Sequence, residues 1–172
     1  MWALIIMKIE TFYEGIHESV KIFDRFVNRY ELKGRIVADH ICYKCGSSDS
    51  FEKIRSAFET NSEWIYQSII SKRRIAIIRL NNDIETIAGK INLLELSDQK
   101  PDGSQSEGFD HIEVYPKNMG YDDLVTYLEE KGLEVNKTIR PHHTTHEVRT
   151  ESGLIMRLTR EPVLDIIKRE QM

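Results

Sequence analysis

Val37-Ala38-Asp39-His40-Ile41 opens one half of the chain, and Gly108-Phe109-Asp110-His111-Ile112 opens the other. The two histidines are 71 residues apart, about the length of one small module. After each segment the apolar pattern predicts the same order of elements, a strand, a helix and three more strands. The repeat predicts two βαβββ modules that pack together, because each would otherwise expose an unpaired sheet.

The predicted elements follow from periods of 3.6 and 2 in the apolar residues. In the first half they are a helix over 9–30, a strand over 36–45, a helix over 51–58 and strands over 64–70, 75–80 and 91–96, with a polar insert at 81–89. In the second half they are a strand over 109–115, a helix over 121–131 and strands over 134–139, 146–150 and 154–159.

These elements divide the chain into an N-terminal helical segment and one domain. The boundaries that we expect are 1–34 for the helical segment, 35–97 for module one, 98–107 for a linker rich in turn residues, 108–160 for module two and 162–170 for a C-terminal helix. The domain as a whole covers 35–172. A chain of 172 residues is consistent with a single core.

Composition excludes several classes of protein. Hydrophobic residues make up 40% and charged residues 30%, so a disordered chain is not expected. A net charge of -4 argues against binding to nucleic acid, and the short basic run 72–74 is predicted at a hairpin tip. The apolar stretch 1–7 is too short for a signal or a membrane span, so no membrane partner is expected.

Cys42 and Cys45 are the two cysteines, and both lie in one predicted strand. Residues three apart in a strand are separated by roughly 10 Å, beyond the reach of a disulfide. We therefore expect a reduced, cytoplasmic protein. Cys42 shares a strand face with His40, where it is either a small buried residue or a thiolate ligand.

His40 and His111 occupy matching places in the two modules, and Glu95 is the third residue of interest. Glu95 stands in Leu93-Leu94-Glu95-Leu96, where a carboxylate among buried leucines needs a partner. Two imidazoles and one carboxylate are typical ligands of Fe(II), Zn(II), Mn(II) or Ni(II). Taken singly, each histidine is more often a structural residue, but the repeat gives His40 and His111 an independent reason to meet.

The quoted segments resemble the first, fourth and fifth strands of the vicinal oxygen chelate superfamily, which includes glyoxalase I, bleomycin-resistance proteins and extradiol dioxygenases. More narrowly, the chain resembles the bacterial YecM-like proteins from its first helix to its tail. The resemblance implies an α+β fold, in which two βαβββ modules form an open, cup-shaped mixed sheet around a divalent metal. It also implies that His40, Glu95 and His111 are metal ligands and that substrate oxygens bind the metal.

The fourth ligand position departs from this pattern, because Arg157 stands where glyoxalase-like members place a glutamate. Arg157 either orients an anionic substrate or neutralises a nearby glutamate. Glu113 lies two residues after His111 and faces the same way. It is a fourth ligand, a general base beside the metal, or part of a structural ion pair with Arg157.

His142, His143 and His146 form a second histidine cluster after Pro141. A surface loop is one interpretation of this cluster. The other is that His146 reaches the cup as a proton shuttle.

Two functions from different classes are compatible with these residues. One is a metal-dependent enzyme of the isomerase, lyase or oxygenase type that acts on a small, oxygen-rich and possibly anionic molecule. The other is a binding protein that sequesters a small ligand without catalysis, as the resemblance to bleomycin-resistance proteins implies. A monomer or a homodimer is expected in either case.

Overall fold

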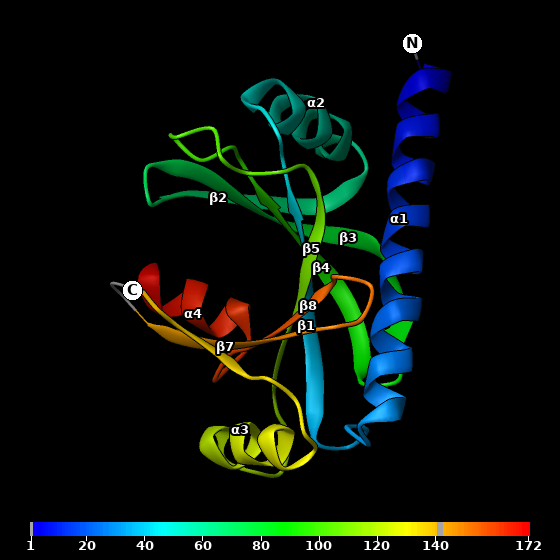
Figure 1. Ribbon diagram of the computed structural model, residues 1–172. Helices are drawn as coiled ribbons and strands as arrows, with labels where there is room; N and C mark the ends of the chain where they lie inside the picture. Colours follow the sequence, from blue (N-terminus) through cyan, green and yellow to red (C-terminus); the bar gives the residue numbers. More distant parts are fainter. Residues whose placement is uncertain (1, 141–142) are drawn as a thin grey trace.

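The computed structural model describes residues 2–140 and 143–172, with side chains from residue 9 onward. In chain order the elements are α1 (Trp2–Arg29), β1 (Ile36–Lys44), α2 (Ser48–Glu59), β2 (Ser62–Ile70), β3 (Arg73–Thr86), β4 (Gly89–Ser97), β5 (Gly108–Pro116), α3 (Tyr121–Glu130), β6 (Asn136–Ile139), β7 (Thr144–Arg149), β8 (Ile155–Leu158) and α4 (Val163–Glu170). Figure 1 shows their arrangement.

All eight strands belong to one mixed sheet, in the order β2-β3-β4-β1-β5-β8-β7-β6. In each half the first strand is parallel to the fourth, so β1 pairs with β4 and β5 pairs with β8. The two halves join where β1 and β5 run antiparallel at the centre of the sheet. The expected α+β fold with one open mixed sheet is therefore confirmed.

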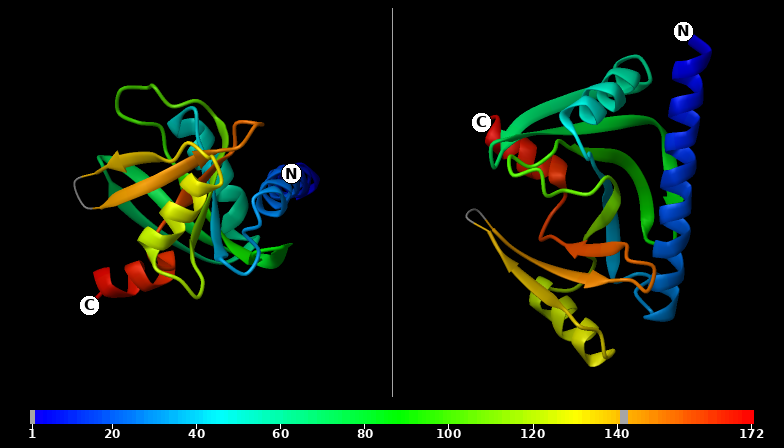
Figure 2. Two further views of the ribbon diagram at one scale, coloured as in Figure 1. Left: turned by 60° about the horizontal axis from the view of Figure 1, so that its bottom comes forward. Right: turned by 45° about the horizontal axis from the view of Figure 1, so that its top comes forward.

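The helices lie on both faces of the sheet, as the views in Figures 1 and 2 show. Buried residues of α1 and α3, such as Phe23 and Leu128, share one large core with the strand residues Ile78 and Leu94. The alternate residues of the same strands face the other way, and there they contact α4. This smaller cluster contains Ile77, Leu93 and Ile167, with Tyr66, Val163 and Leu164 at its edge.

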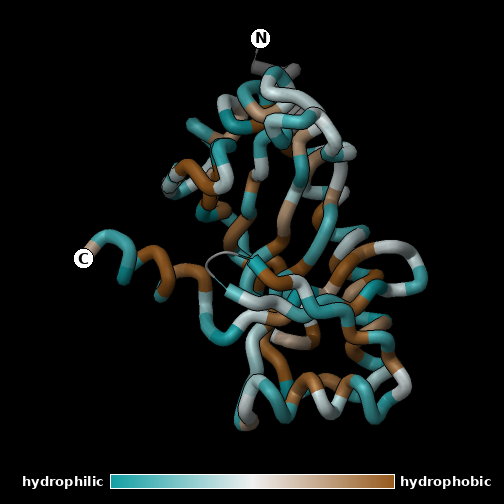
Figure 3. Tube along the Cα trace, turned by 60° about the vertical axis from the view of Figure 1, so that its left-hand side comes forward, coloured by the Kyte–Doolittle hydropathy of each residue, from teal (hydrophilic) through white to brown (hydrophobic). Residues whose placement is uncertain are grey.

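α4 is amphipathic, and Figure 3 shows hydrophobic residues where it joins the body of the protein and hydrophilic residues at its end. α4 therefore packs on the face of β3 and β4 that carries Ile77 and Leu93, the face to which Glu95 also points. The N-cap is Pro162, whose extended backbone (φ -59°, ψ 143°) turns the chain into the helix.

Two boundaries differ most from the sequence-based prediction. α1 begins at Trp2 rather than near Ile9, since the apolar residues before Ile9 are compatible with a continued helix. β3 runs through most of the predicted polar insert to Thr86. A register shift between Arg79 and Ile84 interrupts its pairing with β4, and Ile84 after the shift is buried again.

The loop between the two halves is held by buried polar groups. Gln105 Nε2 donates to the carbonyl oxygens of Cys45, Ser97 and Asp98 at 2.9, 3.3 and 3.0 Å. Arg74 of the predicted hairpin tip lies on β3 instead, where its Nε donates to Asp98 Oδ2 at 2.8 Å. This linker is therefore fixed to module one.

Both cysteines are buried and free; Cys42 lies in β1, and Cys45 directly follows the last residue of that strand. Among the residues that the structure describes, no helix is long and apolar enough to cross a membrane.

Candidate metal centre

The centre of the sheet carries two β-bulges, each of which inserts an extra residue directly before a histidine. In β1 the register jumps from Ala38 to His40, so that Asp39 is the extra residue. In β5 the corresponding extra residue is Asp110, because Cys42 faces His111 and Tyr43 faces Phe109. Bulges re-aim side chains and are common beside functional sites. The repeated Asp-His dipeptide thus has the same local geometry in both strands.

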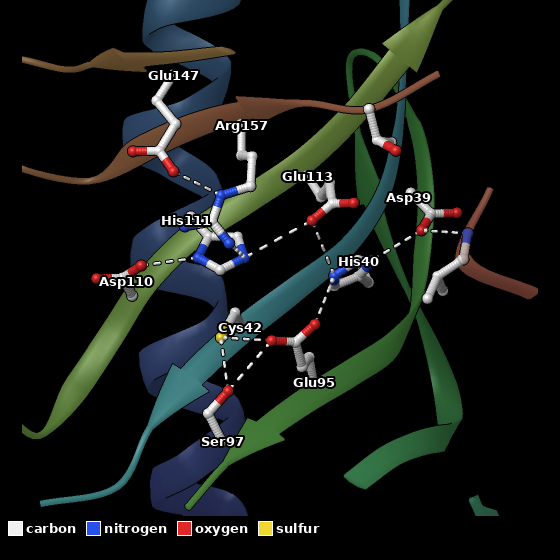
Figure 4. Close-up of polar contacts among 12 residues, drawn as sticks. Asp39, His40, Cys42, Glu95, Ser97, Asp110, His111, Glu113, Glu147 and Arg157 are labelled. Carbon is white, nitrogen blue, oxygen red and sulfur yellow. Dashed lines mark hydrogen bonds and ion pairs between the residues drawn. The ribbon is translucent and has the colours of Figure 1, made fainter. Parts of the chain in front are cut away.

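Each bulged aspartate holds the ring of the histidine that follows it (Figure 4). His40 Nδ1 lies 2.7 Å from Asp39 Oδ2, and His111 Nδ1 lies 2.7 Å from Asp110 Oδ2. A carboxylate at Nδ1 selects the tautomer that carries its proton there, so Nε2 of each ring is left facing the centre.

The two aspartates are themselves fixed, by different groups. Asp39 Oδ2 accepts a second hydrogen bond from the backbone N–H of Val163, the first residue of α4, at 3.1 Å. Asp110 Oδ2 lies 3.0 Å from Lys44 Nζ. The orientation of His40 is thus linked to the C-terminal helix, and that of His111 to a lysine at the end of β1.

Glu95 reaches the same point from β4. Its Oε2 lies 3.3 Å from His40 Nε2, and its Oε1 accepts hydrogen bonds from Ser97 Oγ at 3.2 Å and from Cys42 Sγ at 3.4 Å. The predicted alternation of β4 is confirmed, since Leu94 and Leu96 belong to the large core and Glu95 faces the other way.

Glu113 of β5 lies between the two imidazoles. Its Oε2 is 3.6 Å from His40 Nε2 and 3.9 Å from His111 Nε2. Its side chain is 13% exposed. Glu113 therefore belongs to the same group as the three predicted ligands and is close enough to exchange protons with whatever binds between them.

Three residues, His40, Glu95 and His111, fit a divalent metal ion and are called the trio below. One ligand atom from each lies within 4.8 Å of the other two. Atoms that share one ion lie about 3 to 4 Å apart, so binding requires only a small contraction. His40 Nε2 is buried and faces the carboxylates of Glu95 and Glu113 at 3.3 and 3.6 Å, so two anionic groups already surround the atom that would bind a metal.

Charge in the site favours a cation at His40. Burial lowers the pKa of His40, but the surrounding carboxylates outweigh burial and raise it well above its usual value. Burial raises the pKa of Glu95, but hydrogen bonding to His40 and its charge lower it more, so the net shift is downward. The carboxylates that favour a proton on His40 would equally stabilise a metal ion there.

His111 and Cys42 are uncharged for separate reasons. Burial, and then the positive charge of Arg157, lower the pKa of His111, so its ring is neutral and Nε2 can act as a ligand. Burial, and then the charge of Glu95, raise the pKa of the Cys42 thiol well above its usual value. Cys42 is therefore a hydrogen-bond donor to Glu95 rather than a thiolate.

Arg157 of β8 lies at the edge of the trio. Its Nη1 is 3.1 Å from His111 Nε2, and its Nε donates to Glu147 Oε1 at 2.8 Å. Arg140 Nη2 lies 3.6 Å from the same Glu147 oxygen. Burial and the charge of Arg157 lower the pKa of Arg140. A metal ion bound to His111 Nε2 would replace the contact of that nitrogen with Arg157. The Arg157 guanidinium would then lie next to the metal ion.

His146 does not join this group. Its Nδ1 lies 2.9 Å from the hydroxyl of Tyr121, the first residue of α3, and that hydroxyl donates to Leu158 O at 3.2 Å. Side chains alternate along β7, so His146 and Glu147 point to opposite faces. Glu147 lies beside Arg157, whereas His146 contacts Tyr121 and does not reach the trio as a proton shuttle would. His143 is exposed, and His142 lies outside the described residues.

Sequence analysis missed four residues around the trio: Asp39, Asp110, Arg140 and Glu147. The two aspartates carried a signal, because the repeated motif is Asp-His rather than histidine alone. Glu147 could have been found from strand parity once Arg157 was placed. Arg140 had no such signal, since it follows β6 and its proximity to Glu147 depends on the pairing of β6 with β7.

A separate groove of about 780 Å³ lies between α1, α2 and the start of β5, lined on its apolar side by Phe12, Tyr43, Phe58 and Phe109. Tyr43 and Phe109 pack against the large core, whereas Cys42 and His111 face the trio. The groove and the metal trio are thus on different faces of the sheet. None of the trio's ligand groups lines the groove.

Comparison with known proteins gives two matches by sequence. The model of the family described as "YecM protein" matches residues 8–150. Protein YecM of Escherichia coli (strain K12) is 27% identical over 79 residues, which are 46% of this chain and 42% of that protein. The aligned part thus spans less than half of the curated relative.

Solved structures show the same fold. A structural-genomics structure called Protein EC4020 has a TM-score of 0.72 at 19% identity and covers 94% of this chain and 92% of its own. A methylmalonyl-CoA epimerase has a TM-score of 0.51 at 12% identity, over 74% and 97% of the two chains. Hydroxyglutarate synthase from Oryza sativa has a TM-score of 0.50 at 9% identity, over 99% and 85%. The fold is that of the vicinal oxygen chelate proteins.

Proposed function

The chain belongs to the YecM family, and from this and the geometry of the trio we propose that it is a metal-dependent enzyme acting on a small, oxygen-rich, anionic molecule. The observation that carries the proposal is the convergence of His40 Nε2, Glu95 and His111 Nε2, with His40 Nε2 buried and facing two carboxylates. In this proposal these three residues hold a divalent ion of zinc, iron, manganese or nickel. When bound, the ion polarises a substrate oxygen and stabilises negative charge on it.

The chain's own residues have distinct roles in the proposal. Glu113 is the proton-transferring group, because its carboxylate lies within 4 Å of both imidazole nitrogens without being fixed to either. The hydrogen bonds from Ser97 and Cys42 hold Glu95 in place. Asp39 and Asp110 orient the two rings. Such a site suits proton transfer next to a carbonyl, as in an isomerase or lyase.

Arg157 is proposed to bind the anionic part of the substrate. Its Nε is fixed by Glu147, while its Nη1 is shared with His111 and becomes free when that nitrogen is used otherwise. Two proteins of the same fold are named for acidic compounds, which supports an acidic substrate. One is methylmalonyl-CoA epimerase, and the other is hydroxyglutarate synthase in complex with 2-oxoadipate.

The direct test is metal content. Wild type and the variants His111→Ala and Glu113→Gln are purified, exposed to zinc or manganese, dialysed and analysed for metal. We expect about one ion per chain in wild type, far less in His111→Ala, and little change in Glu113→Gln if Glu113 is a base rather than a ligand. Equal metal content in wild type and His111→Ala would contradict the proposal. Metal binding without turnover of any acidic substrate would favour the sequestering function instead.

A further inference from the structure

A group of three charged residues extends from the trio into module two: Arg140, Glu147 and Arg157. Arg157 Nε donates to Glu147 Oε1 at 2.8 Å, and Arg140 Nη2 lies 3.6 Å from the same oxygen. One carboxylate therefore faces two guanidinium groups. The group has a formal charge of +1, and its side chains are only 11%, 19% and 36% exposed for Arg157, Glu147 and Arg140.

Arg140 has hydrogen-bonding capacity that the described protein groups do not use. Its Nε is buried and has no hydrogen-bond partner among them. A guanidinium carries five N–H donors in a plane, and a buried donor without an acceptor is costly. The side chain as a whole is still about one-third exposed, so oxygens of a small ligand can approach it.

The position of the group relative to the trio is fixed by Arg157, whose Nη1 lies 3.1 Å from His111 Nε2. A ligand atom that contacts Arg157 is therefore only a few bonds from one that occupies the centre of the trio. Glu147 keeps Arg157 in place through Nε, and Nη1 faces the trio. Arginine forks match two oxygens of one carboxylate or phosphate group.

We propose that Arg140 and Arg157, held by Glu147, form a binding subsite for an oxyanion of the ligand, a carboxylate or a phosphate group, and that Arg140 is its main contact. The substrate class is then a small molecule with metal-chelating oxygens at one end and a carboxylate or phosphate at the other. Only the position of the ligand's metal-chelating end rests on the proposed function. Binding of the anionic end by the subsite requires no metal.

The experiment measures anion binding by the full chain, first freed of metal and then loaded with zinc. The probes are inorganic phosphate and malonate, each compared with sodium chloride at the same ionic strength, and the readout is the melting temperature against anion concentration. Wild type should show saturable stabilisation. Arg140→Gln should raise the half-saturating concentration about tenfold or more, because it removes a charge-assisted hydrogen-bonding fork.

Two further variants make the result specific. Arg140→Lys keeps the charge but not the fork, and it should recover only part of the affinity. Lys137→Gln removes one exposed positive charge from the same strand, on the face that carries His146, and it should bind both anions like wild type. If Arg140→Gln does not fold, Arg140→Lys decides the question by the same comparison.

Each outcome has one meaning. If neither anion stabilises wild type more than chloride does, or if Arg140→Gln and Arg140→Lys respond like wild type, the subsite is wrong. A stronger response to phosphate than to malonate, or the reverse, supports the subsite and assigns the ligand group. A zinc titration of the same proteins tests the proposed function separately, since failure to bind zinc leaves the anion result intact.

Discussion

At the residue scale, the site depends on how each ligand is held as much as on the ligands themselves. His40 and His111 are fixed by the aspartates that precede them, and Glu95 is fixed by Ser97 and Cys42. Such supporting contacts typically account for a 10- to 100-fold difference in metal affinity, about 1.4 to 2.7 kcal/mol. Arg157 is the exception, because its contact with His111 Nε2 competes with a metal ion for that atom.

Replacing Arg157 by glutamate should therefore change metal binding in a predictable direction. Arg157→Glu removes the competing cation and adds a carboxylate next to His111, so zinc affinity should rise about tenfold or more. Without metal, the new carboxylate faces Glu113 and Glu147, so the variant should melt below wild type. Zinc titration by calorimetry and melting curves with and without zinc measure both effects. Arg157→Met separates loss of the cation from gain of a ligand. Unchanged zinc affinity in both variants would contradict the observed Arg157–His111 contact.

Asp98 offers a pH-dependent test away from the trio. It accepts hydrogen bonds from Arg74 Nε, Ser48 Oγ and the Gln99 N–H at 2.8, 3.0 and 2.8 Å. Burial raises its pKa, but these partners outweigh burial and lower it. A lowered folded-state pKa contributes stability above the unfolded-state value of about 4, and this contribution is lost as pH falls through the folded-state pKa.

Asp98→Asn should accordingly reduce the free energy of unfolding at pH 7 by about 2 kcal/mol. The difference from wild type should shrink as the pH falls from 4 to 2. Urea unfolding at several pH values measures this difference. Glu14→Gln neutralises an exposed carboxylate on α1 and serves as the control, for which little change is expected. A difference that stays constant with pH would show that the loss comes from packing and not from the charge of Asp98.

At the element scale, two β-bulges and one helix N-terminus position the trio. Strand alternation in the sequence was enough to place Glu95 on the face opposite Leu94 and Leu96, and the repeat was enough to pair His40 with His111. The bulges were not predictable, because they depend on the register between β1 and β5, which are far apart in sequence. The contact of α4 with Asp39 was not predictable either, since it depends on where the tail folds back over the sheet.

The hydrogen bond from the Val163 N–H to Asp39 can be tested by removing its donor. Val163→Pro lacks this N–H, and proline is tolerated here because Val163 is the first residue of α4. The extended backbone of Pro162 is also compatible with a following proline. Zinc affinity should fall about tenfold, because His40 loses part of its support. Val163→Ala keeps the N–H and should bind zinc like wild type. Equal losses in both variants would assign the effect to packing of α4 on Leu93.

At the scale of the whole molecule, the sheet order is symmetric about the β1–β5 junction. This order could be predicted from the duplicated βαβββ pattern, since two such units can share one sheet only through their exposed strands. The pattern could not show that α4 covers only the module-one side of the cup. On the module-two side, the residues next to the trio are Arg157, Glu147 and Arg140. An asymmetric substrate, with a chelating end and an anionic end, suits such an asymmetric cup.

The same junction predicts how the protein behaves when it is cut between Asp102 and Gly103, in an exposed turn of the linker. Fragments 1–102 and 103–172 would be joined by the β1–β5 pairing and by the hydrogen bonds from Gln105 to Cys45 and Ser97. Each fragment alone leaves one edge of its central strand unpaired and core residues such as Ile41 or Ile112 exposed. Neither should fold by itself, whereas co-expressed fragments should associate.

Association is measured by co-purification on a tag carried by one fragment and by circular dichroism of each fragment and of the mixture. Zinc should stabilise the complex, because His40 and Glu95 come from one fragment and His111 from the other. Ile112→Lys in the second fragment places a charge in the shared core and should abolish association. A fragment 103–172 that folds as a monomer would mean that the modules are independent, and the trio would then be an interface between two domains rather than the centre of one sheet.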